Sequence, residues 1–587
     1  MTAPDRAGAR LGQRTIGGLV GLACGLLALG PGLRPGYLLF YDLVFVPRLP
    51  LGDRTLGVDG SVPRAVPNDF VVALLSHLMP GWVVEKLVLL VVFAGVGAGV
   101  GALSRTRLGA AAAALAAAWN PYVAERLAIG HWGYLLGYSC LPFLVAAAAA
   151  CREGSPRAPV RLGVWLLLSA ATGSTGAVLG LIAVLCTLAV PGDTQPVRRR
   201  LADLGWALLV FLLANATWWY AYLVLAPSQE SSRAGVEAFM SRPDTPWGVI
   251  GSLLTGGGIW NSGVWFAGRE SPVTSGLALL VVLLCLALAV RDRVWRLSPA
   301  LAGLGVAGLV GLLLAAATAV PGLREVMTAV VTDVPGGGLL RDAQKFVGLW
   351  MVFVAVLAGR LAERVRDAGA RVGSGRATAL GVAAIVALWP VITLTGPAWG
   401  AGGTWRAVSY PASYSSMQER IDRLPPGGVA VFPWNLYRRY AFDHDVVVLD
   451  PWQRLLDRRV LVNDSLPLAG GRDVPGEDPD AAAVGRALAG AGDPLAVLRS
   501  AGVRYVLVQT DQPTTAGMPD LTGTRVLARD GTLRLHDLGP VATPDRHSRG
   551  PERYLGWLLA AAAVVLVAGR AILGTVSRSD VRGLTRG

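Results

Sequence analysis

The sequence predicts a polytopic α-helical membrane protein with an extracytoplasmic α/β domain near its C-terminus. Hydrophobic residues make up 53% of the 587 residues and charged residues only 16%, which is too apolar for a soluble chain of this length. Many apolar runs approach the roughly 20 residues that cross a hydrocarbon core of about 30 Å. One late polar stretch instead carries short strand-like runs between turn residues.

About twelve membrane helices are expected. Ten apolar runs begin near Thr15, Trp82, Leu108, Gly133, Leu204, Gly276, Leu297, Phe346, Thr378 and Tyr554. The apolar stretch 161–190 is interrupted by a Gly/Ser/Thr cluster at 172–176. Two short helices that turn at this cluster agree with the charge rule for membrane topology, whereas a single span does not.

Arginines predict the sidedness of the chain. With a cytoplasmic N-terminus, the basic segments fall on the cytoplasmic side, at 105–107, 152–161, 198–200, 291–296, 360–376 and 570–586. We therefore expect a multi-pass plasma-membrane protein with both termini in the cytoplasm. The net charge of +14 reflects this topology, and no nucleic-acid partner is indicated.

The chain is expected to have three parts. A membrane domain covers 1–396, an α/β domain covers 397–552, and a final membrane helix with a cytoplasmic tail covers 553–587. Strand-like runs lie at 428–433, 445–449, 504–509 and 524–536, the last with an Asp530-Gly531 hairpin turn. Helical stretches near 415–424 and 480–501 alternate with them, as in a small α/β or α+β module.

The segment 37–47 places Asp42 just beyond the first apolar run, on the external side. A charge at the bilayer is costly and is normally kept for ion pairing, a substrate path or proton chemistry. Asp42 is therefore the first candidate catalytic residue.

A second external cluster is the run Asn-Pro-Tyr-Val-Ala-Glu-Arg-Leu-Ala-Ile-Gly-His-Trp at 120–132. Its Glu125, Arg126 and His131 lie between two apolar runs, where loss of water shifts pKa values or demands partners. A functional cleft is one interpretation. The other is that Glu125 and Arg126 extend to the membrane interface.

A third cluster follows a glycine run at 336–338. Arg341 and Lys345 are spaced by one helical turn at the mouth of a span, and two cations on one face suit phosphate or pyrophosphate oxygens. Alternatively, Asp342 neutralises one of them. Lys345 is one of only two lysines in the chain, with Lys86, which favours a specific role.

The sequence lacks the motifs that are typical of several classes of enzyme. The sequence has no Walker loop, Rossmann glycine fingerprint, H-E-x-x-H, G-x-S-x-G or C-x-x-C motif, so soluble nucleotide chemistry is not indicated. Its five cysteines show no paired spacing. No carboxylate pattern predicts metal ligands, and the participation of a divalent cation is left open.

Three of these segments together resemble a known family. Tyr41-Asp42-Leu43, the run 120–132 and Arg341-Asp-Ala-Gln-Lys-Phe346 are similar to the membrane part of actinobacterial α-(1→3)-arabinofuranosyltransferases, which belong to the GT-C superfamily, and more distantly to YfhO-type membrane proteins. The resemblance covers most of 1–395. This chain is much shorter than those enzymes and has only the module at about 398–550 in place of their long carbohydrate-binding region.

The resemblance implies an extracytoplasmic glycosyltransferase that moves a sugar from a polyprenyl-phosphate donor to a glycan or glycolipid hydroxyl of the cell envelope. Asp42 would be the catalytic residue. Glu125, Arg126, His131, Arg341 and Lys345 would bind substrate or phosphate. Two other interpretations are a transporter or flippase of lipid-linked saccharide and a non-catalytic membrane scaffold.

Overall fold

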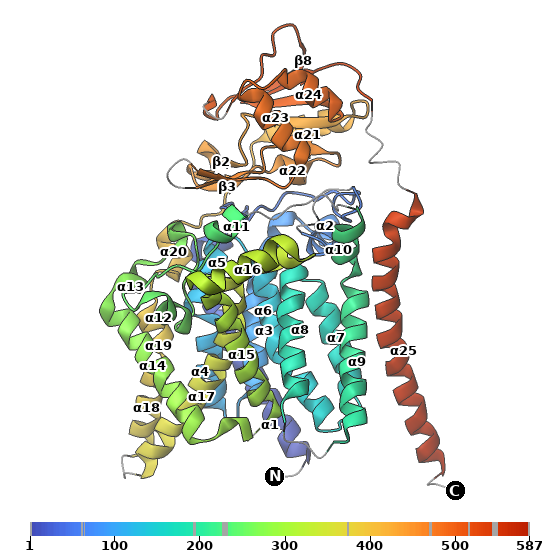
Figure 1. Ribbon diagram of the computed structural model, residues 1–587. Coiled ribbons are helices and arrows are strands. Elements are labelled where there is room, and N and C mark those ends of the chain that lie inside the picture. The colour runs from blue at the N-terminus through green and yellow to red at the C-terminus, as the bar shows by residue number, and fades with distance from the viewer. Residues whose placement is uncertain are drawn as a thin grey trace.

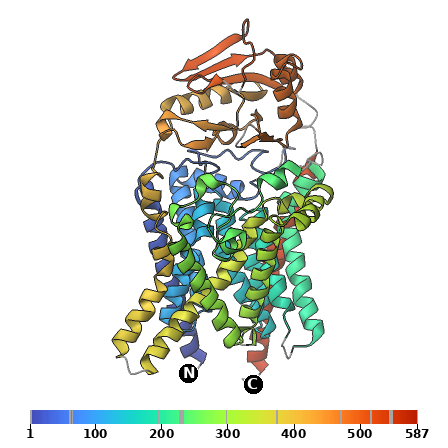
Figure 2. The ribbon, with the colours of Figure 1, turned by 60° about the vertical axis from the view of Figure 1, so that its left-hand side comes forward.

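A computed structural model describes residues 3–59, 63, 65–191, 195–225, 233–296, 298–371, 375–468, 472–514, 517–542 and 550–584. It has a helical bundle with a smaller domain seated across one end (Figure 1). The first helix starts, and the last helix ends, at the opposite end of the bundle (Figure 1). The view from another side shows the same arrangement (Figure 2).

Seven helical segments among the described residues are long and apolar enough to cross a membrane. They overlap α1 (Ala3–Leu29), α3 (Gly81–Leu103), α6 (Trp132–Arg152), α14 (Pro272–Arg291), α15 (Pro299–Ala317), α17 (Val347–Arg371) and α25 (Leu555–Leu584). Two bent pairs raise the number to nine. These pairs are α9 (Val197–Ala214) with α10 (Ala216–Tyr220), and α18 (Arg376–Ala387) with the segment that starts at α19 (Trp389–Thr393).

By length and composition the described residues thus give seven to nine candidate spans, against the expected number of about twelve. Three of the apolar runs fold into shorter helices, namely α4 (Arg107–Ala118), α7 (Ala158–Ala170) and α8 (Ser174–Ala189). Helix α4 stops because the Asn120 side chain caps a new helix with Pro121 in its first turn. The stretch 161–190 does contain two helices, and Gly173 lies between them with φ 92°.

Glycine allows the first two long helices to pack backbone to backbone. A Cβ atom at Gly97 of α3 would lie 2.3 Å from the carbonyl oxygen of Gly17 in α1. No larger residue fits at such a distance, which is the small-residue packing common between membrane helices. Elsewhere in the bundle, residues 347–359 in the first half of α17 are all buried.

The smaller domain, which we call the α/β domain, has a mixed five-stranded sheet with strand order β4-β1-β7-β9-β8. Strands β4 and β7 are parallel to β1, and β9 is antiparallel to β7 and β8. The strands are β1 (Gly428–Phe432), β4 (Val460–Leu461), β7 (Val503–Gln509), β8 (Arg525–Asp530) and β9 (Leu533–Asp537), and the main helices are α21 (Ala412–Asp422), α23 (Pro479–Leu488) and α24 (Pro494–Ser500). The expected mixture of strands and helices in this region is confirmed.

Two hairpins extend from the five-stranded sheet. They are β2 (Tyr437–Arg439) with β3 (Val447–Leu449), and β5 (Leu466–Leu468) with β6 (Arg472–Val474). The β2–β3 hairpin lies at the base of the α/β domain and faces the bundle, whereas β8 lies at the far end (Figure 1). The hairpin is thus the part of the domain that approaches the first loop after α1.

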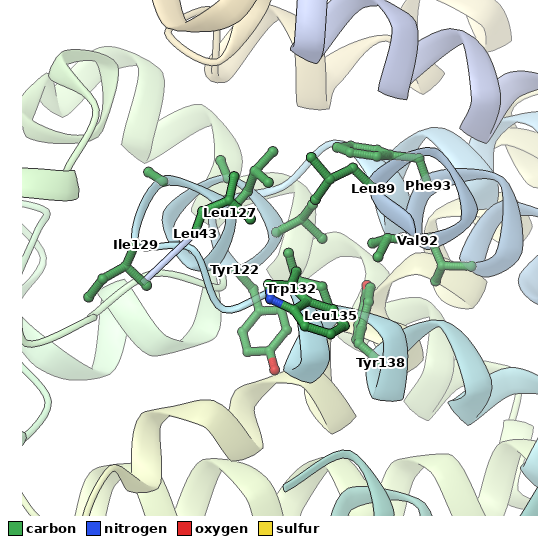
Figure 3. Close-up of a cluster of buried hydrophobic side chains, with 14 of the residues drawn as sticks. Leu43, Leu89, Val92, Phe93, Tyr122, Leu127, Ile129, Trp132, Leu135 and Tyr138 are labelled. Carbon is green, nitrogen blue, oxygen red and sulfur yellow. The ribbon is translucent and has the colours of Figure 1, made fainter. Parts of the chain in front are cut away.

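Apolar side chains fix that first loop to the bundle. Leu43 is fully buried and lies in one cluster with Leu127, Ile129 and Leu135, as Figure 3 shows. Burying a leucine or isoleucine side chain contributes roughly 1.5–3 kcal/mol. The residue that follows Asp42 is therefore anchored firmly, and Asp42 itself has a defined position.

Asp443, in the loop of the β2–β3 hairpin, is an acidic residue in a buried position. Its side chain is buried, and its Oδ2 atom has no hydrogen-bond partner among the described residues. Burial raises the pKa of Asp443 to about 8, because the charged form is poorly solvated there. An unfolded aspartate has a pKa of about 3.9, so the folded chain holds a proton that the unfolded chain has lost at neutral pH.

We expect Asp443→Asn to change the pH dependence of stability. In the parent, the free energy of unfolding should fall as the pH rises from about 4 to about 8, because the unfolded state binds fewer protons there. The amide cannot ionise, so the thermal midpoint of the variant should exceed that of the parent at about pH 9 and match it near pH 4. Thermal unfolding of the full chain at several pH values measures this.

Asp445→Asn is the matched control, because Asp445 is exposed in the same loop. Its curve should run parallel to that of the parent. If Asp443→Asn also ran parallel to the parent, burial would not be raising the pKa of Asp443.

Candidate functional site

Asp42 lies where the first loop, the bundle and the α/β domain meet. Its backbone N–H donates to the carbonyl of Ile129 at 3.1 Å. Its Oδ1 accepts a hydrogen bond of 2.9 Å from the Tyr437 hydroxyl in β2, and its Oδ2 lies 3.2 Å from Nε2 of His131. One third of the Asp42 side chain is exposed, so the carboxylate is oriented and still accessible.

Gly130 allows Asp42 and His131 to meet. It has φ 87°, which favours glycine, and a Cβ atom there would lie 2.2 Å from the Leu43 backbone nitrogen. Any other residue would push the first loop away from the turn between α5 (Pro121–Ala128) and α6. Glycine at position 130 is thus a steric requirement for the contact between His131 and Asp42.

His131 bridges Asp42 and Arg126. Its Nδ1 lies 3.0 Å from Nη1 of Arg126. A guanidinium has only donors, so Nδ1 has to accept, and the ring proton is then on Nε2, facing Asp42. In this arrangement the Nε2–H of His131 donates to the Asp42 carboxylate.

Arg126 is completely buried in α5, and its guanidinium is committed to partners. It forms a two-pronged ion pair with Asp342, with Nη2 and Oδ1 at 2.9 Å, and it donates from Nε to Gln344 at 3.1 Å. Burial raises the pKa of Asp342, but the charge and hydrogen bonds of Arg126 lower it more, so the net shift is downwards. Asp342 is therefore ionised and holds Arg126 in place against His131.

Lys345, three residues after Asp342, is also buried. Its Nζ donates to the Thr175 hydroxyl at 3.1 Å and lies over the Tyr134 ring, 5.6 Å from its centre. The Tyr122 hydroxyl donates to the Lys345 carbonyl at 2.9 Å. Tyr134 also packs on His131, with ring centres 4.6 Å apart, so Lys345 and His131 contact the same aromatic ring.

Arg341 is directed elsewhere. Two short 3-10 turns, η5 (Gly337–Leu340) and η6 (Ala343–Phe346), replace the helical turn that the sequence predicts. The Arg341 guanidinium pairs with Glu477 of the α/β domain at 2.9 Å and covers the Phe239 ring. Arg341 and Lys345 thus bind different partners in this structure and do not share one face.

Glu125 is buried on another side of α5. Its side chain faces the buried ion pair of Asp244 and Arg269, and its carboxyl shares a hydrogen bond with that of Asp244. Burial raises the pKa of Glu125 well above its ordinary value, and the charge of Asp244 raises it further. For Asp244 the attraction of Arg269 outweighs burial and lowers the pKa. Glu125 is therefore a neutral acid beside an ionised one.

The sequence does not identify three members of the site. Thr175 belongs to a helix-breaking cluster, and Gln344 carries no charge that would draw attention. Tyr437 gives no signal, because it lies 395 positions from Asp42.

The described residues give one result on metal ligands and one on cavities. No group of three or more His, Cys, Asp or Glu side chains among the described residues could hold a metal ion. A pocket of about 10 Å³, enough for roughly one water, is lined instead by Asn120, Arg269, Trp389 and their neighbours. The Asp42 side chain itself is one-third exposed, so the candidate site is accessible at this carboxylate.

Comparisons with known proteins give a likeness of fold. No family model and no curated protein matches the chain. A cryo-EM structure of arabinofuranosyltransferase AftD from mycobacteria has a TM-score of 0.49 at 16% sequence identity, over 92% of this chain and 40% of that chain. Two classes of an AftD mutant have TM-scores of 0.45 at 15% and 16% identity. This chain spans about 40% of the length of the first of these structures.

Replacing the carboxyl group by an amide should affect stability differently at the two neighbouring acids, Glu125 and Asp244. Glu125→Gln replaces a neutral acid by a neutral amide of the same shape, so the thermal midpoint should stay close to that of the parent. Asp244→Asn leaves Arg269 buried without its counter-charge, which costs roughly 3–5 kcal/mol. Thermal unfolding of both purified variants checks this. Equal destabilisation by the two changes would contradict the assignment of the proton to Glu125.

Proposed function

We propose that this chain is a membrane glycosyltransferase that uses a polyprenyl-phosphate sugar as donor and a hydroxyl of a cell-envelope glycan or glycolipid as acceptor. The reaction takes place on the extracytoplasmic face. The observation that carries the proposal is the Asp42 carboxylate, held by His131 and Tyr437 at 3.2 and 2.9 Å and still one-third exposed. Such a group is oriented for proton transfer and open to a substrate.

Asp42 acts as the general base. The acceptor hydroxyl gives its proton to the carboxylate while its oxygen forms a bond to the anomeric carbon of the sugar. The bond between that carbon and the phosphate oxygen breaks, and its electron pair leaves with the polyprenyl phosphate. The Nε2–H of His131 holds the carboxylate in the direction from which it can accept this proton.

Cations near Asp42 stabilise the charge that develops on the leaving phosphate. Lys345 is the best candidate, because its ammonium keeps donor capacity beyond its bond to Thr175. Arg126 acts mainly through His131, since its own donors are committed to Asp342 and Gln344. Arg341 lies at the contact with the α/β domain, and we assign it to binding of the acceptor.

The candidate residues lie at helix ends and in loops. His131 precedes α6, Asp342 precedes η6, and Asp42 lies in the first loop. A transporter would hold its substrate near the middle of the membrane. The placement at one end of the bundle favours transfer chemistry at the surface over the flippase alternative.

Asp42→Asn should abolish sugar transfer in proteoliposomes supplied with polyprenyl-phosphoarabinose or polyprenyl-phosphomannose and a glycan acceptor. An amide cannot accept the proton, and removal of a general base costs roughly 10²- to 10⁴-fold in rate. Asp53→Asn is the matched control, because Asp53 lies in the same loop and pairs with Arg553 at 2.8 Å. Its transfer rate should remain close to that of the parent.

Transfer measured with both donors distinguishes the alternatives. If Asp42→Asn transfers sugar at the parent rate, Asp42 is not the base and the proposed mechanism is wrong. If the parent moves labelled lipid-linked sugar across the bilayer and transfers none, the transporter interpretation takes its place.

A further inference from the structure

The β2–β3 hairpin pairs directly with the loop that carries Asp42. Tyr41 forms a parallel bridge with Val448. Its N–H donates to the Val447 carbonyl at 2.5 Å, and its carbonyl accepts from the Leu449 N–H at 2.9 Å. One residue of the first loop, Tyr41, is thus bridged through its backbone to the edge of a hairpin that lies far later in the chain.

This pairing holds Tyr41 in a conformation that it would rarely adopt alone. Tyr41 has φ 43°, in the left-handed region that is strained for a bulky residue. Both of its backbone groups are satisfied by β3. The orientation of the neighbouring residue Asp42 therefore depends on the α/β domain. It depends also on the hydrogen bond of Asp42 to Ile129 and on the buried side chain of Leu43.

The same hairpin contributes a side chain to the carboxylate. Tyr437 starts β2 and pairs with Leu449 across the hairpin. Its ring packs edge-on against Tyr41, with ring centres 6.3 Å apart, and its hydroxyl donates to Oδ1 of Asp42. One oxygen of the carboxylate is therefore held by the bundle, through His131, and the other by the α/β domain.

We propose that Tyr437 is a positioning residue for the transfer reaction and that docking of the β2–β3 hairpin completes the active site. This inference rests on the proposed function. A carboxylate offers about four lone-pair positions. Two of them are fixed by Tyr437 and His131, which leaves the exposed side of Asp42 aimed at the acceptor hydroxyl. Without Tyr437 the carboxylate is held at one oxygen only and is free to turn.

Docking of the α/β domain does not depend on the Tyr437 hydroxyl. Tyr410 donates to the Phe45 carbonyl at 2.9 Å, and Arg454 pairs with Asp69. The backbone pairing of Tyr41 with β3 also remains when Tyr437 is changed to phenylalanine. A variant at Tyr437 therefore separates the orientation of Asp42 from the attachment of the domain.

The test compares Tyr437→Phe with Tyr410→Phe in the full chain. Each variant removes one hydroxyl from a contact between the α/β domain and the first loop, but only Tyr437 touches Asp42. Purified variants in proteoliposomes are assayed for transfer to acceptor, hydrolysis of the donor, KM for the donor, and thermal midpoint.

We expect Tyr437→Phe to lower kcat for transfer about tenfold, the scale of one lost hydrogen bond, with an unchanged KM for the donor and an unchanged thermal midpoint. Hydrolysis should fall less than transfer, because a small water molecule depends less on the direction of the base than a bulky acceptor does. Tyr410→Phe should transfer like the parent.

Two results would overturn the inference. Equal kcat values and equal transfer-to-hydrolysis ratios in both variants would show that Tyr437 does not position Asp42. A fall in activity that follows a fall in thermal midpoint would show a purely structural role. In either case an inactive Asp42→Asn variant would leave the proposed function standing, whereas an active one would remove it.

Discussion

The buried guanidinium of Arg126 is the constraint on which the site depends. A fully buried charge is tolerated only when it is paired and hydrogen-bonded, and Arg126 meets this requirement through Asp342, Gln344 and His131. The pairing joins α5 to the segment before α17. It also fixes the proton of His131 on the nitrogen that faces Asp42, so one buried ion pair determines the hydrogen bonding of an accessible carboxylate.

The α/β domain is the second part of this arrangement. It meets the bundle at the first loop, where the left-handed Tyr41 is held by β3 and Asp42 is bonded to Tyr437. Backbone strain of this kind persists only where the surrounding structure fixes it. A domain that comes late in the sequence thereby fixes the conformation of the loop that follows the first helix. The proposed reaction takes place where the α/β domain contacts this loop.

The sequence predicts the short-range part of the site and fails on the rest. The sequence indicates Asp42, Arg126 and His131, because charge beside apolar runs is costly. It also groups Glu125 with Arg126, but consecutive residues on an α-helix point about 100° apart. Glu125 therefore faces Asp244 and Arg269, whereas Arg126 pairs with Asp342. The expected helical face with Arg341 and Lys345 is absent, because the segment forms two 3-10 turns. Tyr437 could not be found, because its contact arises only from the docking of the α/β domain.

A cryo-EM structure in lipid nanodiscs with a phosphonate analogue of a polyprenyl-phosphate sugar would test the central claim most directly. The account predicts that the anomeric carbon lies beside the exposed side of Asp42, with the phosphonate oxygens directed towards Lys345 and the lipid chain against the bundle. A sugar bound away from Asp42, with this carboxylate still facing only Tyr437, His131 and solvent, would contradict it.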